Sequence, residues 1–291
     1  IPLSVLYPFK IAFYEKLGYK VVDEQIFYNF EISVIKYNET NYHMKEVERI
    51  NEDIIQVYDN VINNYDYIAK RAEMQWKSFY EENYKFICYN KDQPVGYVIL
   101  HFPKKTAELL ANLQHPEKTI YVIEAFWLNH TAKQTIFNFL WSHRDQRKYI
   151  AGYFPFNENI VDLLTTPRIL DRKIVGNSLL RIINVKYVLK NLKYPLLSFS
   201  ILLHIRDKQC PWNNGFFNLN SKNGTVNVEF KEETGNDVDI KIDISHLAQL
   251  LAGFRTIKEL LEFGFIVINH EKFEILQNLF PKTNNYFKFR E

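Results

Sequence analysis

The stretch that decides the fold reads FYEKLGY and occupies residues 13–19. Apolar and aromatic residues recur at helical spacing over residues 11–17, and Gly18 is the residue type that commonly ends a helix. Upstream, residues 3–6 have the composition of a buried strand end, and residues 19–30 form a mostly β-forming run. The sequence therefore predicts a strand, a short helix and a second strand in this order.

A second mixed α/β module is predicted downstream. Apolar residues at three-to-four spacing indicate helices, and short β-forming runs bounded by turn residues indicate strands. The Asn90–Pro94 turn joins two of these strands into a hairpin. The expected elements are helices at about 45–61 and 66–82, strands at 84–89, 95–102 and 119–128, a helix at 131–143 and a strand at 149–154, followed by an irregular connection and further strand and helix at 179–192.

After residue 195 the sequence favours a sheet followed by three short helices. Asn223-Gly224 is a strong hairpin signal between two β-forming runs. Alternation of aspartate and isoleucine over 237–244 predicts a strand with one solvated face. Ser245 is expected to begin the first helix, and Thr256 with Glu259 forms a capping-box pattern at the start of the second.

Composition limits the classes of function. The 291 residues include 36 basic and 34 acidic side chains, for a net charge of +2, and no long basic run that would indicate nucleic-acid binding. No apolar run approaches the 18 residues that would predict a membrane span. Cys88 and Cys210 lie far apart in the sequence, which favours two buried free thiols in the cytoplasm. The opening Ile1-Pro2 resembles the interior of a domain, so we expect a preceding segment.

Several common catalytic motifs are absent from the sequence. It has no Walker loop, no G-x-G-x-x-G and no nucleophile elbow, and its eight histidines lack the spacing of metal ligands. Asp237, Asp239 and Asp243 could suggest a cation site, but their two-residue period favours a solvated strand face. We therefore expect no metal site.

In its context, the 13–19 stretch resembles the GNAT acyltransferase fold, in which an "FY-x-K-x-GF/Y" signature follows the fifth strand. The resemblance implies that Tyr14 is the general acid that protonates the thiolate of coenzyme A when it leaves. A phenol suits this role because its pKa lies above that of the thiol. The same resemblance implies that Phe9, Lys10 and Phe13 line the thioester end of acetyl-CoA.

The order of modules resembles the "enhanced intracellular survival" (Eis) type of bacterial N-acetyltransferase, which has two GNAT modules and a sterol-carrier-protein-like domain. The stretches that carry the resemblance are Val98–Leu100, Thr131–Trp141, Leu180–Val185, Ser245–Arg255, Phe280-Pro281 and Tyr286-Phe287. The implied fold class is α/β (α+β) with tandem GNAT-like modules, the first incomplete. The expected domains are residues 1–40 as the remnant of the first module, 41–195 as a degenerate second module and 196–291 as the sterol-carrier-like domain.

Two departures from the family pattern stand out. The turn at residues 129–134 has neither the glycines nor the arginine of an acyl-CoA pyrophosphate loop. In the family, the terminal carboxylate directly follows the Tyr-Phe pair and serves as base. Here four more residues follow Phe287, and they can displace the carboxylate by roughly 13 Å. We therefore assign no role to Glu291.

The resemblance implies transfer of an acetyl group from acetyl-CoA to a primary amine of a polyamine-like or aminoglycoside-like acceptor. It further implies a homo-oligomer, and the charge balance and the lack of a long apolar run lead us to expect neither nucleic-acid nor membrane partners. A rival interpretation is a non-catalytic lipid-binding protein, in which Phe216, Phe217, Phe254 and Phe263 line an apolar cavity. The plainer alternative for these four residues is an ordinary hydrophobic core. A purely structural or assembly role for the later modules is a third possibility.

Overall fold

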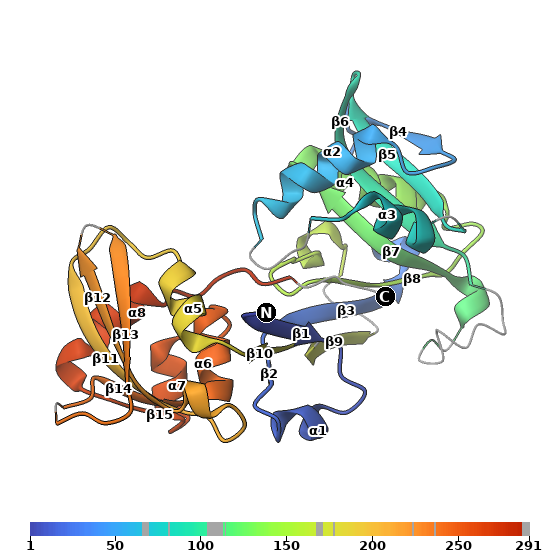
Figure 1. The fold of residues 1–291 in the computed structure, drawn as a ribbon. Helices are drawn as coiled ribbons and strands as arrows, with labels where there is room; N and C mark the ends of the chain where they lie inside the picture. The colour runs from blue at the N-terminus through green and yellow to red at the C-terminus, as the bar shows by residue number, and fades with distance from the viewer. Residues whose placement is uncertain are drawn as a thin grey trace. The chain divides into compact units, whose positions relative to one another are not determined.

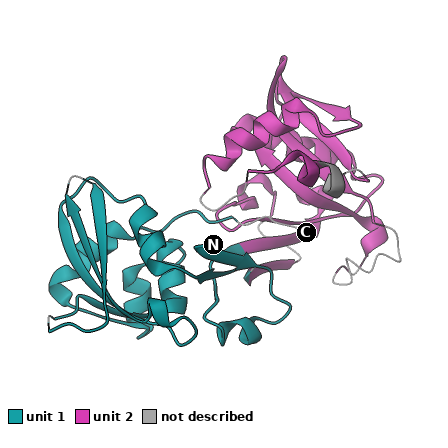
Figure 2. Cartoon of the chain, viewed as in Figure 1, with its two compact units in different colours: residues 1–24, 176–287 teal, residues 25–175, 288–291 magenta. Residues whose placement is uncertain are grey.

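The computed structural model describes residues 1–65, 70–80, 82–103, 113, 115–166, 171–176, 178–222, 224–235 and 237–286, with residues 77–80 described by their backbone alone. The chain forms two compact units (Figure 2). Unit 1 combines Ile1–Glu24 with Gly176–Phe287, and unit 2 combines Gln25–Val175 with Lys288–Glu291. The first strands of the chain are thus grouped with its C-terminal third.

Unit 2 is built around a seven-stranded sheet with the order β4-β5-β6-β7-β8-β3-β9 (Figure 1). Within it β7 and β8 run parallel, whereas β4–β5, β5–β6, β6–β7 and β3–β8 are antiparallel pairs. The strands are β3 (Glu24–Glu31), β4 (His43–Val47), β5 (Tyr84–Asn90), β6 (Gln93–His101), β7 (Thr119–Trp127), β8 (Tyr149–Pro155) and β9 (Asp171–Gly176). The helices are α2 (Glu52–Ile62), α3 (Glu73–Tyr80) and α4 (His130–Ser142), with single 3-10 turns at Ile32–Val34, Pro116–Lys118 and Val161–Leu163.

The two faces of this sheet have separate cores. Ile136 and Leu140 of α4 pack against Val98 and other buried residues of the sheet. On the other face, Tyr58 of α2 contacts Phe126 of β7 edge-on at 5.9 Å between ring centroids. Because successive side chains of a strand point to opposite faces, the apolar strands β6 and β7 supply both cores.

Unit 1 contains two smaller sheets. In the first, β10 (Leu179–Ile182) lies between β1 (Leu3–Leu6) and β2 (Lys20–Val21), and both pairs are antiparallel. The second has the order β13-β12-β11-β14-β15. Its strands are β11 (Phe199–Arg206), β12 (Gly215–Lys222), β13 (Thr225–Lys231), β14 (Ile240–Asp243) and β15 (Ile266–Ile268). The helices of unit 1 are α1 (Ile11–Glu15), α5 (Val185–Asn191), α6 (Ile244–Leu251), α7 (Ile257–Glu262) and α8 (Phe273–Leu279). Short 3-10 turns lie at Pro211–Asn213 and His270–Lys272.

Several helix starts differ from the sequence prediction, among them that of the helix expected at 66–82, which begins at Glu73. The helix predicted from residue 45 begins at Glu52, because the Asn51 side chain accepts a hydrogen bond from the Ile54 N–H, and residues 43–47 form the edge strand β4 instead. Asp243, and not Ser245, caps α6, since its carboxylate accepts from the Ser245 N–H. An Asp or Asn at this position satisfies an N–H that the first helical turn leaves unpaired.

Other predictions agree with the structure. The capping box of Thr256 and Glu259 is present at α7. Both cysteines are free and buried, and burial raises the pKa of the Cys88 thiol to about 12. Within the described part of the chain, no helix combines the length and apolar character needed to cross a membrane. The domain boundaries near residues 40 and 195 stay a prediction.

Candidate active site

The helix α1 that carries Tyr14 is short and ends in a defined turn. Gly18 has a φ of +81°, the left-handed conformation that glycine adopts without steric cost. The Tyr19 N–H donates to the Tyr14 carbonyl at 3.3 Å, and the Gly18 N–H donates to the Glu15 carbonyl at 3.0 Å. This pair of bonds is the Schellman arrangement that closes a helix C-terminus. It returns the chain directly into β2.

Three of the four predicted site residues lie together. The ring of Tyr14 is 5.4 Å from that of Phe9 and 5.2 Å from that of Phe13, both edge-on, and Phe9 and Phe13 are 5.4 Å apart. Phe9 is 77% exposed and Phe13 50%, whereas Tyr14 is half-buried. Lys10 is exposed and extended at the N-cap of α1. The roles assigned to these four residues stay predictions.

Polar contacts hold the segment around Tyr14 in unit 1. The Tyr19 hydroxyl lies 2.8 Å from the Ser4 hydroxyl, which joins the chain after α1 to strand β1. The Tyr19 ring contacts Tyr14 edge-on at 5.8 Å. Lys20 forms an ion pair with Glu15 at 2.6 Å. Tyr14 therefore sits on a helix that is fixed at both the strand before it and the strand after it.

A buried ion pair beneath Gly18 was not predicted from the sequence. Nη2 of Arg181, in β10, donates to both carboxylate oxygens of Asp207 at 2.8 and 2.7 Å. The side chains of Arg181 and Asp207 are 2% and 0% exposed. Asp207 also accepts from the Asn213 side-chain amide at 3.0 Å. The signal available in the sequence was a single arginine inside the apolar run of β10.

The Arg181 guanidinium lies directly against the turn that ends α1. A Cβ built on Gly18 would lie 2.8 Å from Nη1 of Arg181 and 2.9 Å from its Cζ. Nη1 has no hydrogen-bond partner among the described residues, so the guanidinium is held by the bonds of Nη2 to Asp207 and by packing. Arg181 thus fixes how closely α1 approaches β10.

The Gly18→Ala variant is expected to destabilise unit 1 by about 2–5 kcal/mol, because the strained left-handed alanine costs about 1–2 kcal/mol and overpacking about 1–3 kcal/mol. Gly264→Ala is the matched control: Gly264 has a φ of +70° but nothing within 4 Å of its Cβ position. The Gly264→Ala variant is expected to lose only the stability that corresponds to the strained left-handed backbone, about 1–2 kcal/mol. Urea unfolding measures both variants, and equal losses would contradict the close contact with Arg181.

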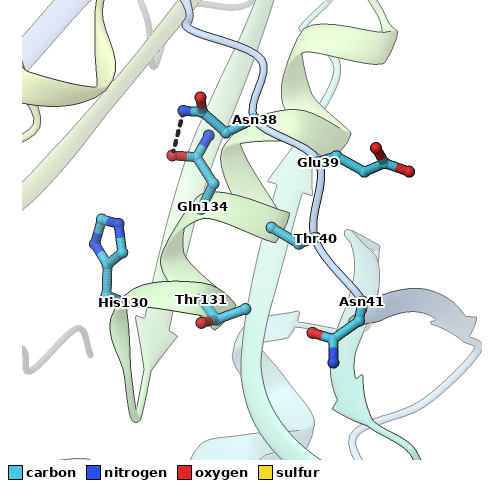
Figure 3. A pocket seen from close by; sticks show the side chains of 7 residues that line it. All are labelled: Asn38, Glu39, Thr40, Asn41, His130, Thr131 and Gln134. Carbon is cyan, nitrogen blue, oxygen red and sulfur yellow. Dashed lines mark hydrogen bonds between the residues drawn. The ribbon is translucent and has the colours of Figure 1, made fainter.

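Unit 2 has an open cleft of about 680 Å³ beside the start of α4 (Figure 3). Asn38 Nδ2 donates to Gln134 Oε1 at 3.1 Å, which holds the connection before β4 against the helix. The residues that line the cleft are Asn38, Glu39, Thr40, Asn41, His130, Thr131 and Gln134. Among them the carboxylate is Glu39, and no lysine or arginine contributes, so the lining suits polar or cationic groups better than phosphates.

The start of α4 does not fit an acyl-CoA pyrophosphate. The Ala132 N–H donates to the Asn129 side chain at 2.9 Å, so one of the free N–H groups is already used. The ammonium of Lys133 is paired with Glu158 at 2.5 Å. Backbone N–H groups and the positive dipole end at a helix start are what hold a pyrophosphate, and here one N–H and the neighbouring ammonium are already engaged. These two contacts support the expectation from the sequence that this turn is not the pyrophosphate cradle, which stays a prediction.

Three of the four phenylalanines in the rival lipid-cavity interpretation do not face a common cavity. Phe216 and Phe217 are neighbours on β12 and therefore point to opposite faces of the sheet. Phe217 is buried against Phe230, while Phe263 is 62% exposed and stacks on Phe265. One cavity cannot be lined by both Phe216 and Phe217, because strand alternation places them on opposite faces, and the buried Phe217 fits the alternative of an ordinary core.

Comparison with known families assigns two domains. Residues 68–182 match the model of the acetyltransferase (GNAT) domain, and residues 185–288 match the model of the sterol carrier protein domain. The chain is thus a mixed α/β protein with a GNAT domain followed by a sterol-carrier-like domain, as predicted. Tyr14 lies outside both matched ranges. No curated protein matches the chain in sequence.

Solved structures share the fold over nearly the whole length of this chain. A probable N-acyltransferase from Enterococcus faecalis has a TM-score of 0.83 at 20% identity, with 100% of this chain and 72% of that chain covered. A GCN5-related N-acetyltransferase from Anabaena variabilis gives 0.81 at 21%, with 99% and 72% covered. Eis1 from Mycobacterium abscessus gives 0.73 at 17%, with 100% and 74% covered. At these identities the likeness establishes the fold alone.

Proposed function

We propose that this protein is a cytoplasmic N-acetyltransferase that moves an acetyl group from acetyl-CoA to a primary amine. The GNAT fold supports N-acetyltransferase activity in general. The observation that carries the specific proposal is the position of Tyr14, half-buried on α1 with the rings of Phe9 and Phe13 within 5.4 Å. An aromatic-walled phenol at a strand–helix junction suits a proton donor at a thioester.

In the proposed reaction the amine nitrogen bonds to the acetyl carbonyl carbon and the carbon–sulfur bond breaks. Sulfur leaves with the electron pair, and the Tyr14 phenol donates its proton to the thiolate. The proton lost from the amine passes to solvent, from which the phenolate is reprotonated. A tyrosine can serve in this role because a phenolic O–H can give its proton to a thiolate that develops in the transition state.

The acceptor class proposed from the Eis resemblance is a polyamine-like or aminoglycoside-like primary amine. A cationic acceptor is attracted to carboxylates whose charge is not offset by nearby lysine or arginine side chains. The cleft beside α4 has this character, since, among the residues that the structure describes, Glu39 lines it and no lysine or arginine does. The assay that tests the class measures release of free coenzyme A thiol with a polyamine, an aminoglycoside and an amino acid as alternative acceptors. Turnover with the amino acid alone would contradict the proposed class while leaving acetyl transfer standing.

Calorimetric titration of acetyl-CoA tests whether the described chain binds the donor. Binding with one-to-one stoichiometry is expected if the proposal holds. Acetyl-pantetheine, which lacks the pyrophosphate and adenosine, is the matched ligand. Because the start of α4 offers no pyrophosphate site, the chain is expected to bind both ligands within about tenfold of each other through its own residues. Absence of heat with either ligand would contradict donor binding by this chain.

A further inference from the structure

A β-bulge in unit 2 redirects one acidic side chain. In the pairing of β7 with β6, Val122 and Glu124 face two consecutive residues of β6, so Ile123 has no directly opposite partner. Before the bulge, the even-numbered Val122 packs in the core under α4. After the bulge, the odd-numbered Trp127 packs against the same core. An extra residue shifts the alternation of side chains by one. Glu124 therefore points to the opposite face, where α2 lies.

Glu124 is buried, and the side chains of Arg71 and Tyr97 both donate hydrogen bonds to it. Its side chain is 1% exposed. Arg71 Nη1 donates to Oε1 at 2.8 Å and Nη2 to Oε2 at 2.7 Å, which is the bidentate geometry of a guanidinium on a carboxylate. The Tyr97 hydroxyl donates to Oε1 at 2.6 Å. Tyr97 of β6 thus orients the Glu124 carboxylate, whose two oxygens both face Arg71.

Aromatic rings enclose the guanidinium of Arg71. Its Cζ lies 4.2 Å from the ring centroid of Tyr58 and 4.6 Å from that of Trp76. The two rings contact each other edge-on at 5.0 Å, and Phe126 lies behind Tyr58 and Tyr97 at 5.9 Å from each. Flat aromatic faces attract a weakly hydrated planar cation more than a compact ammonium. The box of Glu124, Tyr97, Tyr58 and Trp76 therefore has the chemistry of a guanidinium receptor.

The receptor and its occupant belong to different parts of the fold. The four box residues lie on the regular elements α2, α3, β6 and β7. Arg71 lies between α2 and α3, just before α3 begins at Glu73. Side chains on strands and helices hold their geometry without the ligand better than side chains on connections do. The box is therefore expected to keep its shape when Arg71 is removed.

We propose that Glu124, Tyr97, Tyr58 and Trp76 form a guanidinium-binding site, that Arg71 occupies it as an internal ligand, and that a small alkylguanidinium compound can take the place of Arg71. The site lies in unit 2 and does not depend on Tyr14 or on acetyl transfer. Its ligand class follows from the two-point contact with the carboxylate and from the stacking faces, which together select a planar fork-shaped cation.

The Arg71→Ala variant, titrated with methylguanidinium chloride at constant ionic strength, tests the site. The melting temperature of the variant is expected to rise in a saturable way, by roughly 3–6 °C at ten times the half-saturating concentration. Methylammonium chloride is the matched cation and is expected to give a smaller rise. If Arg71→Ala does not fold alone, methylguanidinium is expected to restore the native circular dichroism spectrum. Absence of both effects would overturn the proposal.

The double variant Arg71→Ala with Glu124→Gln is the control for the carboxylate. It lacks the charged acceptor and is expected to lose the response to methylguanidinium, and an equal response would overturn the assigned site. In the wild-type protein the NMR resonance of the Arg71 Nε–H shows whether methylguanidinium replaces the Arg71 side chain. This resonance is identified by its absence in Arg71→Ala. It is expected to move toward the position of an exposed arginine as methylguanidinium is added, and an unchanged resonance would overturn replacement of Arg71.

Discussion

Tyr14→Phe is expected to lower the turnover number for acetyl transfer about a hundredfold or more, which is the usual contribution of a general acid. Phenylalanine keeps the ring contacts with Phe9 and Phe13 at 5.2–5.4 Å but has no proton to donate. The measurement is the steady-state release of coenzyme A thiol with a saturating amine. Because ring packing is conserved, the melting temperature is expected to stay within about a degree of the wild type.

Tyr187→Phe is the matched control for loss of a phenol. Tyr187 lies on α5, is 54% exposed and belongs to the same unit as Tyr14. Its variant is expected to keep wild-type turnover. A Tyr14→Phe protein with unchanged turnover would remove Tyr14 from the chemistry and leave α1 with a packing role.

Arg181→Met is expected to destabilise unit 1 by about 3–5 kcal/mol, since it leaves the Asp207 carboxylate buried without its cation. The Asp207 side chain is 0% exposed and is expected to keep its bond from Asn213 in the variant, but amide donors do not neutralise a charge. The loss of contact with Gly18 adds to the effect, because the guanidinium fills the space below the turn. Urea unfolding followed by circular dichroism measures the change.

Lys20→Met is the matched control because it removes a cation from a pair in the same unit. The side chains of Lys20 and Glu15 are 27% and 37% exposed, so water can solvate the carboxylate that is left. A partly exposed pair contributes about 0–1 kcal/mol. Equal losses of unfolding free energy in Arg181→Met and Lys20→Met would contradict the larger contribution that we expect from the buried Arg181–Asp207 pair.

Local signals in the sequence predicted much of the secondary structure. Gly18 predicted the end of α1, and Thr256 with Glu259 predicted the start of α7, because a cap depends on residues within one turn. Where a stronger nearby cap competed, the prediction was wrong, as at Asp243 against Ser245. The strand β4 was assigned to a helix because its pairing with β5 is made by residues about 40 positions away.

The candidate site was only partly accessible to sequence reasoning. Phe9, Phe13 and Tyr14 lie within one helix and its approach, so their proximity follows from local spacing. Arg181 reaches Gly18 through the pairing of β10 with β1 and β2, a contact across more than 150 positions. The inward direction of Glu124 depends on a bulge in the pairing of β7 with β6. The sequence of β7 alone does not show this register.

The sequence by itself determined the order of a strand–helix–strand segment, a mixed α/β module and a sheet followed by helices, together with the caps that end several of them. Those features depend on hydrophobic period and on side chains a few residues apart. Only the tertiary structure decided that β10 lies between β1 and β2, that Arg181 supports the turn of Gly18, and that Arg71 fills the aromatic box at Glu124. Buried charges find their partners through long-range packing, because the low polarity of the interior penalises every unpaired alternative.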